Sequence, residues 1–314
     1  PVLDEKALLR RVEPALTRAA RAPEDATVRL VGGRPEVVPG RTGVTFDRED
    51  ITDGFLEVVA QEDGERTLEA GTVKGQPEFT AADARKLRIR RVVSSSTTNY
   101  PHADYRNTNQ GRAAELVTGT VLRPGETFSF NSTVGERTAA NGFVEGFIIS
   151  DGIFEEDFGG GVSQVVTTLF NAAFFAGLED VEHQPHSFYI DRYPIGREAT
   201  VAWGVVDLRF KNDTPHGILI EADIDPSSPG REGAMNVKMW STKHWDIKAG
   251  VSKRHNFTKE DTRFIDDQAC EPNDGYRGFD IDVYRYFREP GKEKVVRKET
   301  LSTTYTPSDT VICR

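Results

Sequence analysis

Residues 159–177 read GGGVSQVVTTLFNAAFFAG, and this stretch carries the most distinctive pattern in the chain. Three glycines precede an apolar run of helical length, and Gly177 follows it. Helices commonly end at a glycine, because glycine adopts the left-handed backbone conformation without strain. The pattern predicts a long buried helix from Val162 to about Ala176. Because strand patterns follow this helix, we expect an α+β fold in which a central helix packs on an antiparallel sheet.

The segments on either side of this helix show short strand patterns and one further helix. A helix is expected over 107–118, and strands are expected over 127–130, 143–150, 187–190, 199–203, 207–210, 217–222 and 235–239.

The first 90 residues predict a small α+β module of their own. Apolar residues at helical spacing indicate helices over 3–20 and 51–60, with short strands at 27–31, 36–38 and 66–68. Thr80, with Asp83 three residues later, resembles a capping box at the start of a third helix. We therefore expect three regions, residues 1–90, 91–250 and 251–314.

The C-terminal region favours a β-hairpin. Residues 278–314 alternate apolar and polar residues around Glu289-Pro290-Gly291, which is a turn signal. The two cysteines, Cys270 and Cys313, lie at the ends of this region and favour a disulfide, which closes a loop of about 40 residues and stabilises by roughly 3–4 kcal/mol. A disulfide predicts an exported protein. The alternative is two free thiols in a cytosolic protein.

Charge and composition exclude several classes of function. The 314 residues carry a net charge of -10, which argues against nucleic acid or an anionic lipid surface as the main partner. The sequence contains neither an apolar run long enough to span a bilayer nor a signal peptide. Because the chain begins at Pro1, it reads as a fragment or processed form whose upstream signal or membrane anchor has been removed.

Ser163 is the first candidate for chemistry. The glycines deliver it to the first turn of the expected helix, where unpaired backbone N–H groups favour a developing negative charge. A nucleophile there gains a partial oxyanion hole. The structural alternative is a glycine turn followed by an ordinary serine N-cap.

His186 and Asp207 follow in the order used by papain-like and transglutaminase-like hydrolases. In that arrangement Ser163 is the nucleophile, His186 takes its proton and Asp207 orients the imidazole. The analogy rests on order and element type alone. Serine is much less acidic than the cysteine of those enzymes, so the site is a serine enzyme, an inactive copy or a binding site.

A ligand groove is expected around the same segment. Its expected lining residues are Gly159, Gly160, Gly161, Gln164, Thr167, Arg192 and Arg197. Arg192 and Arg197 could clamp a carboxylate, although surface ion pairs are the alternative. His183 and His186 form an HxxH pattern without a third ligand at metal spacing, so we expect no metal and no cofactor. Acidic residues Asp151 and 155–157 favour a solvated loop over an acid–base pair.

Long, ordered motifs between Ser94 and Ala222 resemble the VanW family. The matching segments are 106–109, 122–131, 134–135, 159–164, 167–168, 186–187, 196–201, 207–208 and 210–212. The resemblance implies an exported bacterial cell-envelope protein, often membrane-anchored, in a family named after a glycopeptide-resistance gene cluster. Many members carry cysteine at the position of Ser163. Residues 1–90 resemble the peptidoglycan-binding domain that often precedes VanW, and the tail more weakly resembles G5-like β-modules.

Three hypotheses for function follow. The first is an extracytoplasmic protein that binds peptidoglycan or its precursors through the groove, since stem peptides carry both amines and carboxylates. The second is an enzyme acting on peptidoglycan amide bonds through Ser163, His186 and Asp207. The third is a structural role in an envelope complex, with the edge of the C-terminal hairpin as the docking surface.

Overall fold

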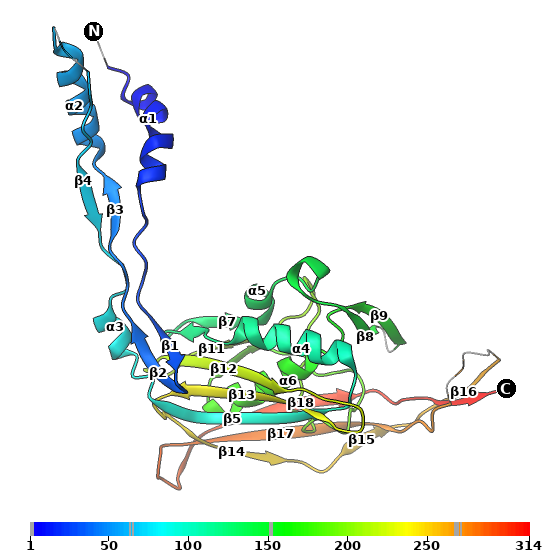
Figure 1. Ribbon diagram of the computed structural model, residues 1–314. Coiled ribbons are helices and arrows are strands. Elements are labelled where there is room, and N and C mark those ends of the chain that lie inside the picture. Colours follow the sequence, from blue (N-terminus) through cyan, green and yellow to red (C-terminus); the bar gives the residue numbers. More distant parts are fainter. Residues whose placement is uncertain (1–2, 63, 65, 151–152, 267–269, 271) are drawn as a thin grey trace. The chain divides into compact units, whose positions relative to one another are not determined.

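The computed structural model describes residues 3–62, 64, 66–150, 153–266, 270 and 272–314. The chain forms two compact units, residues 1–31 with 36–86, and residues 32–35 with 87–314. Helices and antiparallel sheets mix in the chain, as the labelled elements of Figure 1 show, so the expected α+β class is confirmed.

The smaller unit is built from short elements. They are α1 (Glu5–Ala19), β1 (Thr27–Val31), β2 (Arg34–Val38, whose first two residues belong to the larger unit), β3 (Gly43–Phe46), α2 (Arg48–Ala60), β4 (Thr72–Gly75) and α3 (Ala81–Lys86). The predicted capping box is confirmed, because Asp83 N–H donates to Thr80 Oγ1 and Thr80 N–H donates to the Asp83 carboxylate. The strand predicted at 66–68 is wrong. Leu68 packs beside Gly54 of α2, and β4 is the strand that pairs with β3.

The larger unit is organised around an antiparallel four-stranded sheet in the order β5-β13-β12-β6. These strands are β5 (Arg91–Tyr100), β6 (Val121–Leu122), β12 (Ile218–Asp225) and β13 (Gly233–Ser241). Helix α4 (Asp104–Val117) packs on β12, and helix α6 (Ser163–Ala176) packs on β5 and β13. The expected packing of a central helix on an antiparallel sheet is confirmed.

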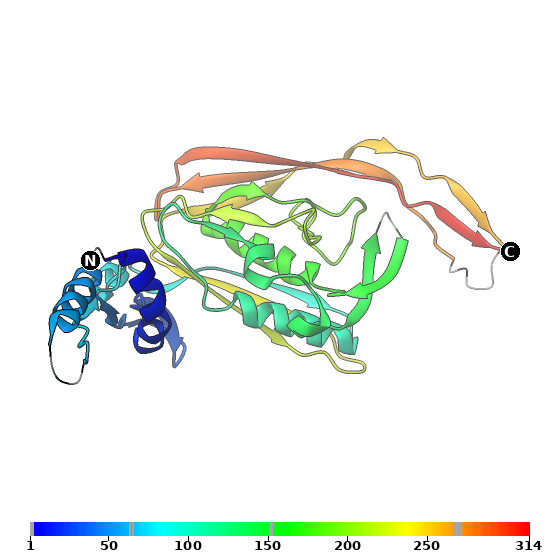
Figure 2. The ribbon, with the colours of Figure 1, turned by 90° about the horizontal axis from the view of Figure 1, so that it is seen from above.

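Further strands extend this unit. A three-stranded sheet contains β7 (Thr127–Ser129), β10 (Glu179–Glu182) and β11 (Arg209–Lys211), next to α5 (Phe130–Val134), a 3-10 turn (Ala139–Asn141) and the hairpin of β8 (Glu145–Ser150) with β9 (Ile153–Phe158). The tail contains β14 (Asp246–Val251), β15 (His255–Thr258), β16 (Thr262–Ile265), β17 (Gly278–Arg288), β18 (Val295–Tyr305) and β19 (Thr310–Cys313). Strands β17 and β18 form the predicted hairpin and run side by side as a long ribbon in Figures 1 and 2.

The strands predicted at 187–190 and 199–203 are wrong. The chain between β10 and β11 is irregular, with isolated bridges from Gln184 to Thr200 and from Ala202 to Val206. Pro185 and Pro194 lack the N–H that a ladder needs, and Gly196 has a positive φ of 65°. His186 therefore stands in a loop and not on a strand.

Helix α6 is the centre of the hydrophobic core. All of its residues except Ser163 and Phe175 are buried. It ends, as predicted, at Gly177, which has a φ of 82°. The helix lies between the four-stranded sheet and β14, and Val283 of β17 belongs to the same core. The tail is therefore part of the compact unit that contains residues 87–250.

Arg285 of β17 satisfies the buried C-terminal end of α6. Its guanidinium donates to the carbonyl oxygens of Leu178 (2.8 Å), Ala173 (3.3 Å) and Phe174 (2.5 Å). The side chain is 2% exposed and reaches Glu299 at 3.3 Å. Burial lowers the pKa of Arg285 to about 10. A cation at a helix C-terminus is favourable because it faces the negative end of the helix dipole.

The predicted disulfide between Cys270 and Cys313 is confirmed, with a Cα–Cα distance of 5.7 Å. It lies beside the parallel pair of β16 and β19. Among the described residues, no helix is long and apolar enough to span a membrane.

We predict that Arg285→Met destabilises the larger unit by about 3–5 kcal/mol, because the carbonyls of Leu178, Ala173 and Phe174 each lose a buried charged donor and Glu299 loses this partner. Urea unfolding followed by tryptophan fluorescence measures this, since Trp203, Trp240 and Trp245 all lie in the larger unit. The control Lys248→Met removes an exposed charge from β14, next to the same strand. It should change stability by less than about 0.5 kcal/mol. Equal unfolding midpoints for the two variants would contradict this role of Arg285.

Candidate functional site

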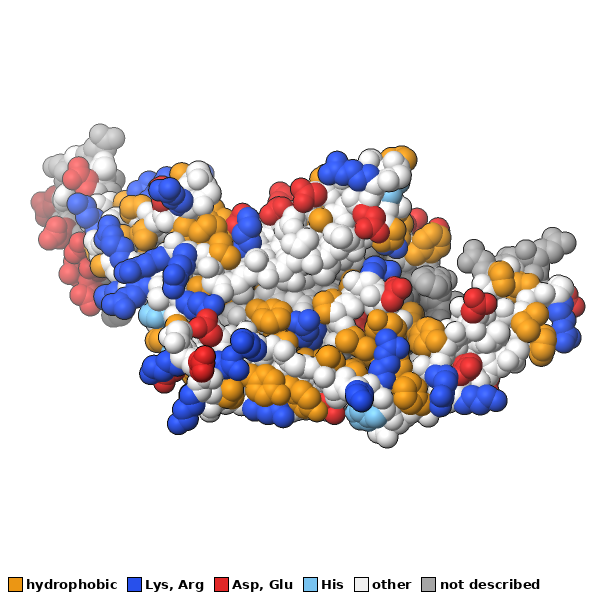
Figure 3. All heavy atoms as spheres, turned by 90° about the horizontal axis from the view of Figure 1, so that it is seen from below, with side chains coloured by type: hydrophobic (Ala, Val, Ile, Leu, Met, Phe, Trp, Pro, Cys, Tyr) orange, Lys and Arg blue, Asp and Glu red, His pale blue; other side chains and the backbone are white. Residues whose placement is uncertain are grey.

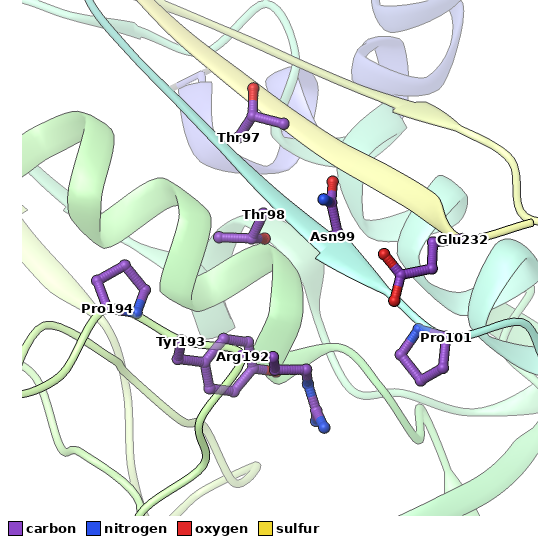
Figure 4. Close-up of a pocket in the computed structure, with 8 residues that line it drawn as sticks. All are labelled: Thr97, Thr98, Asn99, Pro101, Arg192, Tyr193, Pro194 and Glu232. Carbon is purple, nitrogen blue, oxygen red and sulfur yellow. The ribbon is translucent and has the colours of Figure 1, made fainter.

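A groove of about 450 Å³ lies along the outer edge of β5. Its lining residues are Thr97, Thr98, Asn99, Pro101, Arg192, Tyr193, Pro194 and Glu232. Figure 4 shows that they come from two sides, β5 with the start of β13 on one side and the irregular 192–194 segment on the other. The volume suits a small molecule or a few residues of a peptide.

The groove follows the edge of the sheet and not one of its faces. Thr97, Thr98 and Asn99 are consecutive, and successive strand side chains point to opposite faces. All three line the groove, so the groove must run beside the strand. This agrees with the sheet order, in which β5 is the terminal strand.

Gln164 connects the first turn of α6 to this edge. Its side-chain amide donates to Thr98 Oγ1 at 2.5 Å and to the carbonyl oxygen of Asn99 at 3.0 Å. Thr98 also bonds Thr168 of α6, at 2.6 Å between the two hydroxyl oxygens. Gln164 is buried, does not line the groove itself, and supports the lining residue Thr98 from behind.

The opposite wall is held in place by stacking and by turns. Tyr193 is 5% exposed, and its ring stacks on that of His186 with 5.5 Å between the centroids. The guanidinium of Arg192 lies 4.8 Å from the same ring centre. The N–H of Gly196 donates to the Tyr305 hydroxyl at 2.9 Å, which ties this wall to β18. Burial raises the pKa of the Tyr193 hydroxyl, so Tyr193 stays neutral.

Behind Tyr193, His186 pairs with a buried carboxylate. Its Nδ1 lies 2.8 Å from Glu198 Oε2, and the two side chains are 9% and 1% exposed. Glu198 was not predicted as a site residue from the sequence. The pattern that could have pointed to it is an acidic residue between a glycine turn and an apolar β-branched stretch. A buried carboxylate can orient an imidazole and stabilise its charged form.

Asp207 does not orient His186. Its carboxylate accepts from the Ser129 hydroxyl at 2.5 Å and from the Asn131 N–H at 2.8 Å. These bonds hold the start of α5, where a carboxylate satisfies unpaired N–H groups. The role predicted for Asp207 is therefore corrected, and Glu198 occupies the position beside the imidazole.

Ser163 bonds to Thr200 and not to His186. Its hydroxyl is 3.0 Å from Thr200 Oγ1. Glu198, which pairs with His186, and Thr200 lie two residues apart in the irregular chain between β10 and β11. In the described part of the chain, no hydrogen bond joins Ser163 to His186 or His186 to Asp207. Ser163 and His186 thus each contact segment 198–200, through Thr200 and Glu198, without a hydrogen bond to each other.

The glycines before α6 allow their backbone to pack closely against neighbouring segments of the chain. A Cβ on Gly160 would lie 2.4 Å from the backbone carbon of Gly146, so the two chains meet backbone to backbone. Gly161 has a φ of 87°, and a Cβ there would lie 3.2 Å from Arg106. The predicted ligand-binding role for Gly159, Gly160 and Gly161 is not seen in the groove lining, which contains none of them.

Two further predicted ligand residues also lie away from the groove. Thr167 is fully buried, and its hydroxyl donates to the carbonyl of Ala199 (2.9 Å) and accepts from the Ala199 N–H (3.1 Å). Arg197 lies over the rings of Phe174 and Phe175, so it cannot form a clamp with Arg192. Arg192 alone of the predicted lining residues reaches the groove.

The remaining candidates have separate partners. His183 pairs with Asp180 at 2.6 Å, and His186 pairs with Glu198, so the HxxH histidines contact different carboxylates. Among the described residues, no group of three or more His, Cys, Asp or Glu side chains could hold a metal ion. Asp151 of the acidic loop lies outside the described residues.

Comparison with known proteins agrees with the resemblance seen in the motifs. The family model "VanW like protein" matches residues 105–231, and the model "Putative peptidoglycan binding domain" matches residues 1–68. YoaR, an uncharacterized protein of Bacillus subtilis, is 30% identical over 222 residues, which cover 71% of this chain and 72% of YoaR.

A second relative is the vancomycin B-type resistance protein VanW of Enterococcus faecalis. It is 28% identical over 109 residues, which cover 32% of this chain and 39% of that protein. No solved structure matches the chain. The family model and the long match to YoaR together show that the chain belongs to the VanW family.

Proposed function

We propose that this chain is an extracytoplasmic cell-wall protein that binds peptidoglycan or its precursors through the groove beside β5. The observation that carries the proposal is the pair of opposite charges in the groove, Arg192 on one wall and Glu232 on the other. In the described part of the chain, neither side chain forms an ion pair. Peptidoglycan stem peptides offer an amine and a carboxylate, the two groups that such charges recognise.

The family assignment supports a place at the cell wall. One of the two matching models is named for peptidoglycan binding, and it covers residues 1–68. The disulfide supports an oxidising compartment, since disulfides persist mainly outside the cytoplasm.

The strand beside the groove suits a polar ligand that carries few charges. On the face shown in Figure 3, white surface formed by backbone and by side chains that are neither charged nor hydrophobic lies between charged and hydrophobic groups. Strand β5 itself carries the run Ser94-Ser95-Ser96-Thr97-Thr98-Asn99. Hydroxyl and amide groups in such a run offer hydrogen bonds to amides and sugars alike.

A binding experiment tests the groove. Purified sacculi are pelleted with the unaltered protein, with Arg192→Ala and with Glu232→Ala, and soluble disaccharide-tetrapeptide is titrated in parallel. We expect each variant to weaken binding of the soluble muropeptide by about tenfold, the effect of one lost charged contact. The control Lys259→Ala removes an exposed charge from the tail and should bind as the unaltered protein does.

The soluble ligand matters because residues 1–86 could retain sacculi without the groove. Unchanged muropeptide affinity in both groove variants would contradict binding through the groove. Absence of binding to both sacculi and muropeptide would contradict the proposed function as a whole.

A second candidate function is an enzyme that acts on peptidoglycan amide bonds. The observation in its favour is the pair of His186 with buried Glu198, two residues before Thr200, to which Ser163 bonds. A base oriented by a carboxylate is the arrangement that activates a serine. Catalysis would require the Ser163 hydroxyl to turn from Thr200 to His186 when substrate binds.

A muropeptide profile by mass spectrometry tests this candidate. Sacculi are incubated with the unaltered protein, with His186→Ala and with buffer. An enzyme should produce a cleaved or cross-linked species that His186→Ala lacks, with a loss in rate of about 100-fold or more. If the three profiles are identical while the unaltered protein still binds muropeptide, binding without catalysis is the function.

A further inference from the structure

The edge of β5 presents backbone hydrogen-bonding groups to the groove. The Asn99 carbonyl accepts from the side-chain amide of Gln164, and β5 is the terminal strand of its sheet, so we infer that this carbonyl points away from β13. In an antiparallel pair, residues two apart direct their N–H and C=O groups to the same side. Thr97 and Asn99 are two apart and pair with Asn236 and Ala234. With the Asn99 carbonyl directed outward, the N–H of Asn99 and both backbone groups of Thr97 would face the groove as well.

The part of this edge that lines the groove lacks two of the usual protections against strand pairing. Strand β5 is ten residues long, and the segment that lines the groove contains no lysine and no internal proline. Exposed edges of this kind readily accept another strand. Pro101 follows directly, and because it has no N–H it sets the end of any added ladder.

A peptide fits the groove better than a sugar chain does. Sugar rings stack on open aromatic faces, and Tyr193, the aromatic residue of the groove lining, is 5% exposed with His186 stacked on it. The groove instead combines a strand edge, one cation and one carboxylate. An extended peptide with a free amine and a free carboxylate satisfies all three.

The geometry points to the stem peptide of peptidoglycan as the bound part, held in an extended conformation as an added strand on β5. Arg192 receives its carboxylate and Glu232 receives its amine. This inference rests on the proposed function and specifies which part of the polymer occupies the groove. The three lining residues 97–99 span roughly 10 Å of strand, enough to pair with two or three peptide residues.

The opposite wall fixes the width of the groove that the added strand would enter. Residues 190–197 contain two turns, with the Tyr193 N–H bonded to Ile190 and the Arg197 N–H bonded to Pro194. Buried Tyr193 and the bond from Gly196 to Tyr305 hold these turns. A preformed groove loses little entropy when a peptide enters it.

The test compares two substitutions at one position, using calorimetric titration with a soluble stem tetrapeptide that has a free side-chain amine and a free C-terminal carboxylate. Thr97→Pro and Thr97→Val both remove the hydroxyl bond to Asn236. Proline alone also removes the outward N–H, and the ladder to β13 does not use that N–H. We expect Thr97→Pro to bind at least about tenfold more weakly than Thr97→Val, and Thr97→Val to stay within about threefold of the unaltered protein.

A modified ligand gives the same test without altering the protein. A tetrapeptide methylated on a central amide nitrogen cannot pair fully with a strand edge, so it should bind about tenfold more weakly than the unmethylated peptide. Acetylation of the peptide amine should weaken binding to the unaltered protein. The Glu232→Gln variant, which has already lost the contact to the amine, should bind the acetylated and the free peptide equally. Amidation of the carboxylate should behave in the same way with Arg192→Gln.

The outcomes separate this inference from the proposed function. Equal affinities for Thr97→Pro and Thr97→Val, together with no effect of methylation, would overturn strand addition while groove binding stands. Binding to sugar chains but not to the tetrapeptide would overturn the choice of the peptide. If the unaltered protein binds neither, both the inference and the proposed function fail.

Discussion

The C-terminal end of α6 is buried, and the guanidinium of Arg285 donates to two of its carbonyl groups, Ala173 and Phe174, and to the carbonyl of Leu178 just beyond the helix. A helix that is apolar on all sides can be placed in a core only if both of its ends find partners there. The sequence separates Arg285 from Ala173 by 112 residues. The tail is therefore not a separate extension of the larger unit, because β17 supplies a buried donor to the end of the core helix, beside the backbone caps from Gly177 and Leu178.

The first turns of the same helix fix both walls of the groove. Gln164 bonds the edge of β5, while Ser163 and Thr167 bond Thr200 and Ala199, in the segment that follows the opposite wall. All three residues lie within five positions on one rigid helix. The spacing between the two walls is thus set by α6, and the constraint at one end of the helix determines the shape of the site at the other end.

Patterns of local origin were predictable from the sequence, and long-range partners were not. The glycine stop at Gly177, the capping box at Thr80 and the hairpin around Gly291 follow from residue chemistry within a few positions. To predict the groove, one would need the register of β5 against β13 and the path of the 187–198 loop. No local sequence pattern contains this information. Glu198 in place of Asp207 illustrates the difference. Both are acidic residues downstream of His186, and only the bridge between Gln184 and Thr200 brings Glu198 opposite the imidazole.

The residues that suggested catalysis also build the groove. His186 is the surface on which Tyr193 stacks, and Glu198 holds His186 in that position. Ser163 exchanges a hydrogen bond with a hydroxyl and not with an imidazole, so its proton has no base to receive it in this arrangement. A cysteine at this place would ionise more readily at a helix N-terminus, and serine does not gain that advantage. Serine at position 163 therefore weakens the case for chemistry but leaves every contact of the groove walls intact, which is why binding is the function that the geometry supports best.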